Sequence, residues 1–147
     1  ELHVDLLLRV SIHVVSAAVA APLRADGGAG SVPWARLDGE SLILANPANR
    51  VWHQLRARLG EQRRTLAVAH EVAMHSTGLA MARRGLGRLL SPGFCAGSPA
   101  LQGLVVQALV RPVVRWDVSS VRRRAAPPSA EVDALLERVR QTVAAGR

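Results

Sequence analysis

The sequence predicts an α+β fold in which a small antiparallel sheet of about three strands comes first and a mainly helical portion follows. Three observations support this prediction: a two-residue alternation near the start, an Asp-Gly pair between short apolar runs, and helical apolar spacing farther along. The 147 residues suit one domain with one hydrophobic core. We expect a single domain over residues 1–147, strand-rich at 1–45 and helical at 46–121, with a linker at 122–128 and an amphipathic helix at 129–147.

The strand-rich start is predicted from alternation and turn chemistry. Between residues 2 and 14, apolar residues occupy the even positions and polar residues occupy most odd ones. Because successive side chains of a strand point to opposite faces, this period is typical of a half-buried strand. Asp38-Gly39 separates the short runs 32–37 and 40–45, and both turn positions tolerate positive φ, so these runs are predicted to form a hairpin.

A long helix is predicted to begin at Asn46-Pro47. Asn46 would cap the free amides, and Pro47 fits the first helical position. Apolar residues at helical spacing continue to Leu90. Glycine weakens a helix interior by about 1 kcal/mol relative to alanine, so we expect a break near Gly60 or Gly78.

Later segments add two more expected elements. The apolar run at 98–110 has helical spacing, whereas 113–118 fits either a short strand or a helical turn. Ser129 is predicted to cap a final helix, with Glu131 and Asp133 in the first turn, where the helix dipole favours acidic side chains.

The charge of the chain predicts an anionic or acidic partner. The net charge is +8, and every basic residue is arginine. Arginine binds phosphates and carboxylates in a bidentate manner. We therefore expect a protein partner, or a nucleic acid or other anionic polymer, held by Arg63, Arg64, Arg122, Arg123 and Arg124.

The cysteine content and the hydropathy indicate the compartment of the protein and whether a membrane span is expected. Cys95 is the only cysteine, so no intrachain disulfide forms and a reducing, intracellular compartment is favoured. Charged residues interrupt the apolar run at 2–22, so no membrane span is expected there. Three tryptophans are expected to be core or interface anchors; they are Trp34, Trp52 and Trp116.

The cluster from His70 to Ser76 carries the candidate chemistry. It places two histidines and a carboxylate within a segment predicted to be helical. On a regular helix His70 and His75 would lie about 140° apart around the axis, so they would not share a metal ion. We therefore expect no metal site, and the candidate catalytic pair is His70 with Glu71.

Two family resemblances include this pair. The Asp-Gly hairpin and Ala69-His70-Glu71 resemble the small bacterial zinc peptidases of the repressor-cleaving type. In their signature a second histidine follows four residues after the first, where this chain has Met74, so that resemblance implies a degenerate peptidase-like domain.

The second resemblance is to the phosphoacceptor and dimerisation helix of bacterial sensor histidine kinases, over residues 61–90. It is carried by Glu61-Gln62-Arg63-Arg64, His70-Glu71-Val72, His75-Ser76 and Arg88-Leu89-Leu90. The resemblance implies that His70 accepts a phosphoryl group while Glu71 polarises its imidazole. No Gly-rich nucleotide-binding lobe is visible, so such a chain would act as a phosphotransfer or dimerisation module.

The favoured interpretation is a non-enzymatic, basic interaction or assembly subunit without a cofactor, either a homodimer or part of a larger complex. The phosphotransfer module centred on His70 and Glu71 and the degenerate peptidase are the alternatives.

Overall fold

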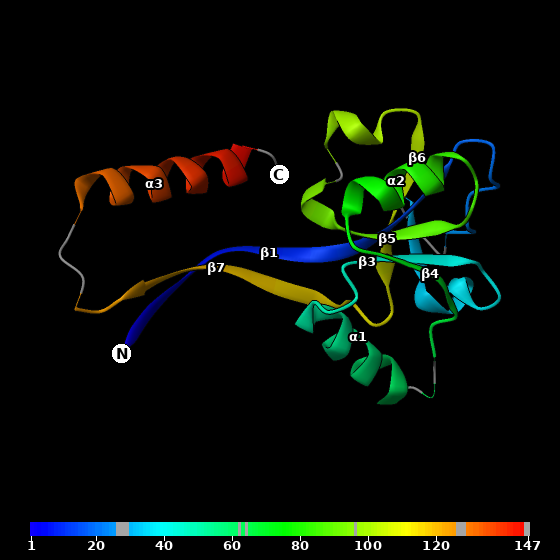
Figure 1. Ribbon diagram of the computed structural model, residues 1–147, viewed down its shortest axis with the longest axis horizontal. Helices are drawn as coiled ribbons and strands as arrows, with labels where there is room; N and C mark the ends of the chain where they lie inside the picture. Colours follow the sequence, from blue (N-terminus) through cyan, green and yellow to red (C-terminus); the bar gives the residue numbers. More distant parts are fainter. Residues whose placement is uncertain (26–29, 62, 64, 96, 126–128, 146–147) are drawn as a thin grey trace. The chain divides into compact units, whose positions relative to one another are not determined.

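The computed structural model shows a mixed α/β fold and describes residues 1–25, 30–61, 63, 65–95, 97–125 and 129–145 (Figure 1). Within these residues, seven strands are hydrogen-bonded in the order β2-β6-β1-β5-β3-β4, with β7 paired to β1. The strands are β1 (Leu2–Ala17), β2 (Ser31–Pro33), β3 (Leu42–Ala45), β4 (Val68–Val72), β5 (Arg88–Pro92), β6 (Leu104–Val110) and β7 (Arg115–Arg123). The α-helices are α1 (Arg50–Glu61), α2 (His75–Arg83) and α3 (Ala130–Ala145). The predicted fold class, three antiparallel strands followed by helices, is therefore wrong.

The chain divides into two compact units. The larger unit is Ser11–Val114, and the smaller unit combines Glu1–Val10 with Arg115–Arg147. β1 contributes residues to both units.

The alternation at the start of the chain does form a strand. β1 includes the whole predicted segment, and its even positions become fully buried from Val10 through Ile12 to Val14. β1 lies between β5 and β6 and is antiparallel to both. Its half-buried pattern follows from the sheet, because one face of these residues packs on the core.

The Asp-Gly hairpin is wrong. Trp34–Leu37 forms the 3₁₀ helix η1, and β2 pairs in parallel with β6, not with β3. Gly39 does have a positive φ of 82°, as a turn residue there requires. The turn chemistry was recognised, but the strands on either side of it have distant partners.

The long helix from Asn46 to Leu90 is also wrong, because this segment contains α1, β4, α2 and β5 in turn. Asn46 has a φ of 52° and lies outside the helix. Asn49 takes the capping role instead, since its Oδ1 accepts a hydrogen bond from the Val51 amide at 3.1 Å.

The apolar run at 98–110 is a strand where a helix was predicted. It contains the 3₁₀ helix η3 (Pro99–Leu101) and then β6. The strand alternative for 113–118 is correct, because these residues lead into β7. Of the expected linker, Arg122 and Arg123 lie in β7, while 126–128 are outside the described residues.

Helix α2 packs closely on the sheet through a glycine. An ideal Cβ on Gly78 would lie 2.7 Å from Leu89 Cδ1 and 3.5 Å from Ile43 Cγ2. Leu89 and Ile43 are fully buried in the cluster that α2 covers. Glycine at this position therefore sets how near the helix approaches β3 and β5.

Polar side chains join segments of the larger unit that are distant in sequence. Arg88 Nε donates to Glu40 Oε2 at 2.6 Å, while its other nitrogens donate to Ser16 Oγ and to the carbonyl of Ala21. Its side chain is only 11% exposed, so this full set of partners offsets the cost of burying the charge.

The buried tryptophans act as anchors, as expected. The indole nitrogen of Trp34 donates to the carbonyl of Pro112, and that of Trp52 donates to the carbonyl of Ala45. Both side chains are buried. Each therefore combines a large apolar contact with a satisfied polar group. The side chain of Trp116 lies outside the part of the chain that the structure describes.

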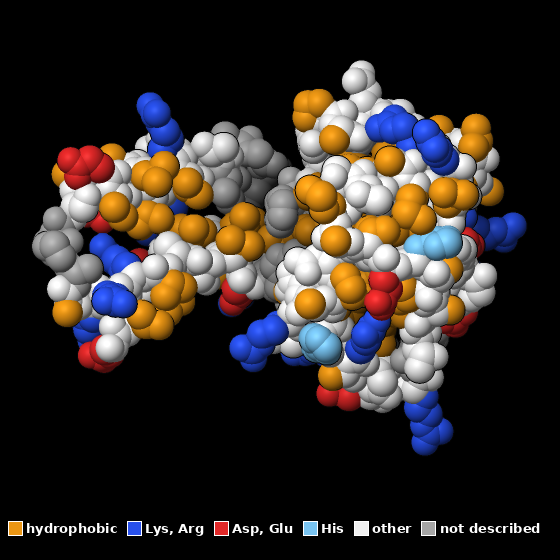
Figure 2. Space-filling model, in the orientation of Figure 1, with side chains coloured by type: hydrophobic (Ala, Val, Ile, Leu, Met, Phe, Trp, Pro, Cys, Tyr) orange, Lys and Arg blue, Asp and Glu red, His pale blue; other side chains and the backbone are white. Residues whose placement is uncertain are grey.

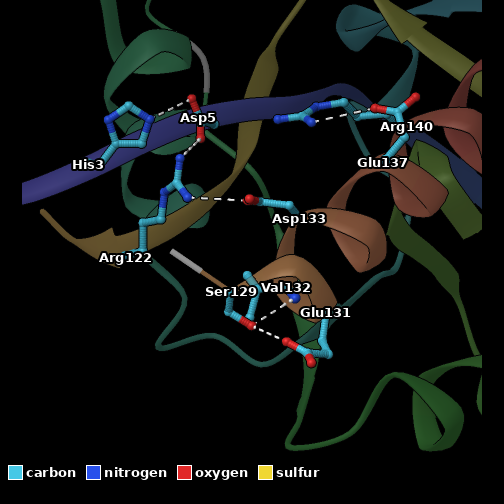
Figure 3. Close-up of polar contacts among 9 residues, drawn as sticks. All are labelled: His3, Asp5, Arg122, Ser129, Glu131, Val132, Asp133, Glu137 and Arg140. Carbon is cyan, nitrogen blue, oxygen red and sulfur yellow. Dashed lines mark hydrogen bonds and ion pairs between the residues drawn. The ribbon is translucent and has the colours of Figure 1, made fainter. Parts of the chain in front are cut away.

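In the smaller unit, Arg122 connects three elements (Figure 3). Its guanidinium lies 4.0 Å from an oxygen of Asp5 on β1 and 3.4 Å from one of Asp133 on α3. His3 Nε2 also lies 3.0 Å from Asp5 Oδ1, within hydrogen-bond distance. Arg124 N donates to the carbonyl of Glu1, so β7 runs opposite to β1.

The final helix begins as predicted. Ser129 Oγ accepts a hydrogen bond from the Val132 amide at 3.3 Å and donates to Glu131 Oε2 at 2.7 Å (Figure 3). That hydrogen bond from Ser129 lowers the pKa of Glu131. Capping and the acidic first turn thus confirm the predicted start of α3.

The smaller unit exposes many apolar side chains. Hydrophobic side chains are visible along α3 and along the ribbon of β1 and β7 (Figure 2). On β1, alternate residues Leu2, Val4 and Leu6 share one face and are 59%, 59% and 49% exposed.

We predict that Gly78→Ala destabilises the chain by about 1–3 kcal/mol, because the added methyl group overpacks a buried contact. The loss should exceed the gain in helix propensity of about 1 kcal/mol. Gly60→Ala in α1 is the matched control, since nothing lies within 4 Å of its ideal Cβ. Urea unfolding measures both variants, and equal stability of the two would contradict the close approach of α2.

Candidate functional site

The candidate site lies at the carboxyl edge of the parallel strands in the larger unit. β3 is parallel to both β4 and β5 and lies between them. The chain passes from β3 through α1 to β4, and then through α2 back across to β5, so α1 and α2 lie on opposite faces of these strands (Figure 1). The order reverses between β3 and β5, and ligands of open α/β sheets bind at such a switch point.

Two loops and the start of one helix surround this switch point. The loop after β3 runs from Asn46 to Asn49, where α1 is capped. β5 is followed at once by the 3₁₀ helix η2 (Gly93–Cys95). Asn46 N donates to the carbonyl of Val72 at 2.8 Å, which joins the ends of β3 and β4.

His75, the first residue of α2, is bound to β5 at this edge. Its Nε2 lies 2.9 Å from Ser91 Oγ. Ser91 is buried and also forms a hydrogen bond with the Cys95 side chain. A hydroxyl group thus lies between an imidazole and a thiol.

His13 brings a second imidazole to the same place from β1. His13 is paired directly opposite Ser91. Opposed residues of antiparallel strands share one face of the sheet. An ideal Cβ on Gly93 would lie 2.8 Å from His13 Cε1 and 2.9 Å from the carbonyl oxygen of Ser11. The missing side chain of Gly93 therefore makes room for the His13 ring.

One nitrogen of the His13 ring has no partner among the described residues. Its Nδ1 atom is buried and has no hydrogen-bond partner among the described residues. Leaving a buried polar atom unpaired costs about 1–3 kcal/mol. This atom is packed against Gly93, since an ideal Cβ there would lie 2.9 Å from it.

Burial shifts the ionisation of this cluster. Desolvation lowers the pKa of both His13 and His75, so their neutral forms are favoured. Burial raises the pKa of the Cys95 thiol, and the hydrogen bond from Ser91 offsets part of that rise. The cluster therefore offers neutral hydrogen-bonding groups at neutral pH.

The predicted catalytic pair does not form. His70 and Glu71 are exposed consecutive residues of the edge strand β4, not helical ones, so their side chains point to opposite faces of the sheet. Glu71 Oε1 accepts a hydrogen bond from Arg56 Nη2 at 3.3 Å instead. Neither the phosphoacceptor arrangement nor a zinc-peptidase helix is present at this position.

The predicted binding arginines are not a bare cationic surface. Arg122 and Arg124 are paired with carboxylates of their own unit, and Arg123 is exposed. Arg63 is exposed after α1, and Arg64 lies outside the described residues. On the face shown in Figure 2, basic side chains are scattered and do not form a stripe.

Two of the residues that do meet, His13 and Ser91, were not predicted as site residues, whereas His75 belonged to the candidate cluster. His13 is one of the odd, polar positions of the strand predicted near the start, and Ser91 directly follows the helix that was predicted to continue to Leu90. The available signal was Ser91-Pro92-Gly93 directly after an apolar run, since polar and glycine residues at the end of a buried strand are typical of a binding loop.

The described residues contain neither a metal-binding cluster nor a helix that could span a membrane. There, no three histidine, cysteine, aspartate or glutamate side chains are grouped so as to hold a metal ion. Nor does any described helix combine the length and apolar character needed to cross a membrane.

Comparisons with solved structures show the same fold. The C-terminal domain of a probable LysR family regulator from Rhodococcus sp. RHA1 matches with a TM-score of 0.70 and 21% identity, over 95% of this chain and 67% of that one. The CcmR regulatory domain of Synechocystis PCC6803, in complex with 2-PG, matches with a TM-score of 0.72 and 11% identity, over 97% of this chain and 67% of that one.

A longer structure matches as well. Full-length CbnR complexed with its target DNA has a TM-score of 0.74 and 12% identity, over 97% of this chain and 48% of that one. The chain thus spans about half the length of this full-length regulator. A search of curated proteins returned no match.

The family model described as the LysR substrate binding domain matches residues 1–144. This match overturns the expected assembly subunit, the histidine-kinase module and the zinc-peptidase relative, and it agrees with the switch-point fold. Because the match extends over nearly the whole sequence, the chain belongs to the LysR substrate-binding domain family.

Proposed function

We propose that this chain is the effector-binding region of a transcriptional regulator and that it binds a small molecule at the switch point between β3 and β5. Its role is regulatory, not enzymatic. The observation that supports this site most directly is the cluster of His13, Ser91 and His75, where a buried ring nitrogen has no partner among the described residues. The family match supports the regulatory role.

The whole protein is proposed to bind DNA as a homodimer. Support comes from full-length CbnR, which was solved with its target DNA. This chain matches about half of the length of that regulator. The CcmR regulatory domain, solved with 2-PG, supports a small-molecule ligand for the matching region. A DNA-bound regulator also fits the reducing compartment that the single cysteine favours.

We predict that at least one compound of a metabolite library raises the melting temperature of the chain. A ligand that binds only the folded state stabilises it by about 2.7 kcal/mol at one hundred times its Kd. NMR shift changes caused by the bound compound should centre on residues 46–49 and 91–95 and on His13.

Gly93→Ala should weaken that binding at least tenfold, because the added Cβ displaces the His13 ring and meets the Ser11 carbonyl. Gly97→Ala is the matched control in the same loop, since nothing lies within 4 Å of its ideal Cβ. Shift changes elsewhere in the chain, or equal affinity of both variants, would contradict the proposed site.

The two histidines predict how the stability of the unliganded chain depends on pH. Their pKa values are lowered on folding, so the unfolded state binds more protons as the pH falls. Stability should therefore be retained above the unfolded-state value of about 6.5 and should decline as the pH falls below it.

Chemical unfolding between pH 7.5 and pH 5, roughly spanning that value, measures the decline. The double variant His13→Asn/His75→Asn should flatten it, whereas His53→Gln, at an exposed position of α1, should leave it unchanged. A decline of the same size in all three proteins would show that other groups cause it.

A further inference from the structure

We infer that the first half of β1 is an interface, and that its occupant is the same strand of a second copy of this chain. The two strands pair edge to edge and antiparallel, which joins two ribbons of β1 and β7 into one four-stranded sheet. The inference gives a contact surface to the homodimer of the proposed function, and in that respect it rests on the proposed function. It does not depend on effector binding at the switch point.

One edge of this half of β1 has no partner strand in the described part of the chain. β1 pairs with β5 from Ile12 onward and with β6 from His13 onward. β7 is the one other described strand that pairs with β1, and a single strand occupies a single edge. A free edge presents unpaired N–H and C=O groups, so a long edge strand with apolar side chains is a template for pairing with another chain.

The smaller unit needs such a partner, because its own sheet is small. Its described strands are the first half of β1 and β7, and its described helix is α3. A two-stranded ribbon is only marginally stable in water, whereas three or more strands with an apolar face form a stable sheet. Leu2, Val4 and Leu6 lie on one face of this ribbon and are between 49% and 59% exposed. Pairing with a second copy extends the ribbon and brings these apolar side chains against their equivalents.

The residue pattern of the strand matches a second copy in one register. A two-fold axis perpendicular to the sheet keeps each side chain on its own face, so even positions oppose even positions and odd positions oppose odd ones. With Val4 opposite Val4 of the second copy, Leu2 lies opposite Leu6 and His3 lies opposite Asp5. One face of the junction is then apolar, while the other pairs an imidazole with a carboxylate twice.

The neighbouring registers bring like charges together. Centring the axis on Asp5 places two carboxylates opposite each other, and centring it on His3 places Glu1 opposite Asp5. Like charges directly opposite each other destabilise a strand pair, whereas opposite charges stabilise it. The first of these registers would also oppose Glu1 with Arg9, but Arg9 is already paired with Asp117 at 2.9 Å. Complementarity of charge therefore selects the register centred on Val4.

The polar groups of the junction are already in place within one copy (Figure 3). His3 Nε2 lies 3.0 Å from Asp5 Oδ1, and the two side chains are 41% and 30% exposed. Both groups are thus held on the same face of β1 and remain accessible to a second copy. Arg122 lies 4.0 Å from the other carboxylate oxygen of Asp5 and holds it from the β7 side.

Sedimentation of the full chain at rising concentration tests the interface. We expect a monomer–dimer equilibrium whose dissociation constant rises by about tenfold or more in Val4→Lys, because two ammonium groups then lie opposite each other at the axis. Val19→Lys is the matched control, since Val19 is 94% exposed and lies beyond the end of β1. A chain that is monomeric at every concentration, or equal weakening by both substitutions, overturns the inference.

Disulfide trapping tests the register. A Cys95→Ser background removes the only native thiol. Opposed residues of paired antiparallel strands have Cα atoms about 4.5–5.5 Å apart, which is within the reach of a disulfide. Val4→Cys should therefore cross-link with itself. Leu2→Cys should cross-link with Leu6→Cys in a mixture but not with itself. Cross-linking of Leu2→Cys with itself, without cross-linking of Val4→Cys, contradicts the register and overturns the inference.

Hydrogen exchange of the wild-type chain decides if a substitution unfolds the smaller unit. The amides of residues 2–7 should exchange more slowly as the protein concentration rises. Slower exchange that appears only at other residues would place the contact between copies elsewhere, and so would overturn this interface.

The outcomes separate this inference from the proposed effector site. A monomeric chain that still binds a metabolite at the switch point overturns the strand interface and leaves the effector site intact; a different polypeptide then covers the free edge. A dimer that is cross-linked through Val4→Cys but binds no metabolite supports the interface and contradicts the effector site.

Discussion

The ion pair between Arg88, whose side chain is 11% exposed, and the partly exposed Glu40 is the interaction that connects the strands of the larger unit. It fixes the start of β5, the strand that joins the parallel half of the sheet to the antiparallel half. The same guanidinium binds Ser16 on β1, so one side chain aligns β1, β5 and the residues before β3. A buried cation tolerates no missing partner, which gives these strands a defined register.

That register explains why the candidate site contains residues from two kinds of strand pairing. Ser91 ends a parallel strand, where the loops of an α/β sheet gather. His13 reaches the same position from an antiparallel neighbour. A purely parallel sheet would have offered loops and helix ends alone, whereas here a strand residue inside the sheet borders the switch point.

The sequence predicted the elements whose signals are local. The alternation of β1 and the Ser129 cap of α3 each depend on neighbouring residues, and both are confirmed. β4 was not predicted, because an exposed edge strand such as Val68–Val72 need not alternate between apolar and polar residues. Its alanine, histidine and glutamate also suit a helix. β6 was not predicted as a strand, because the periodicity of a short apolar run does not distinguish a strand from a helix.

The prediction of the site residues was wrong for a related reason. His70 and Glu71 are adjacent in sequence, and adjacency suggested cooperation only while the segment was taken as helical. His13 and Ser91 cooperate through strand pairing, which no spacing along the chain reveals. Arg122 shows the same limit, because its carboxylate partners lie on β1 and α3 and could not be inferred from a run of three arginines.

The pairing of His13 with Ser91 has a consequence for folding kinetics. The two residues lie about eighty positions apart, and β3, α1, β4 and α2 all intervene. Contacts of such high sequence separation form late, because the loop-closure entropy must be overcome before they contribute stability. A chain emerging during synthesis would thus form the proposed ligand site only after β5 has been synthesised, so partly synthesised molecules would lack that site.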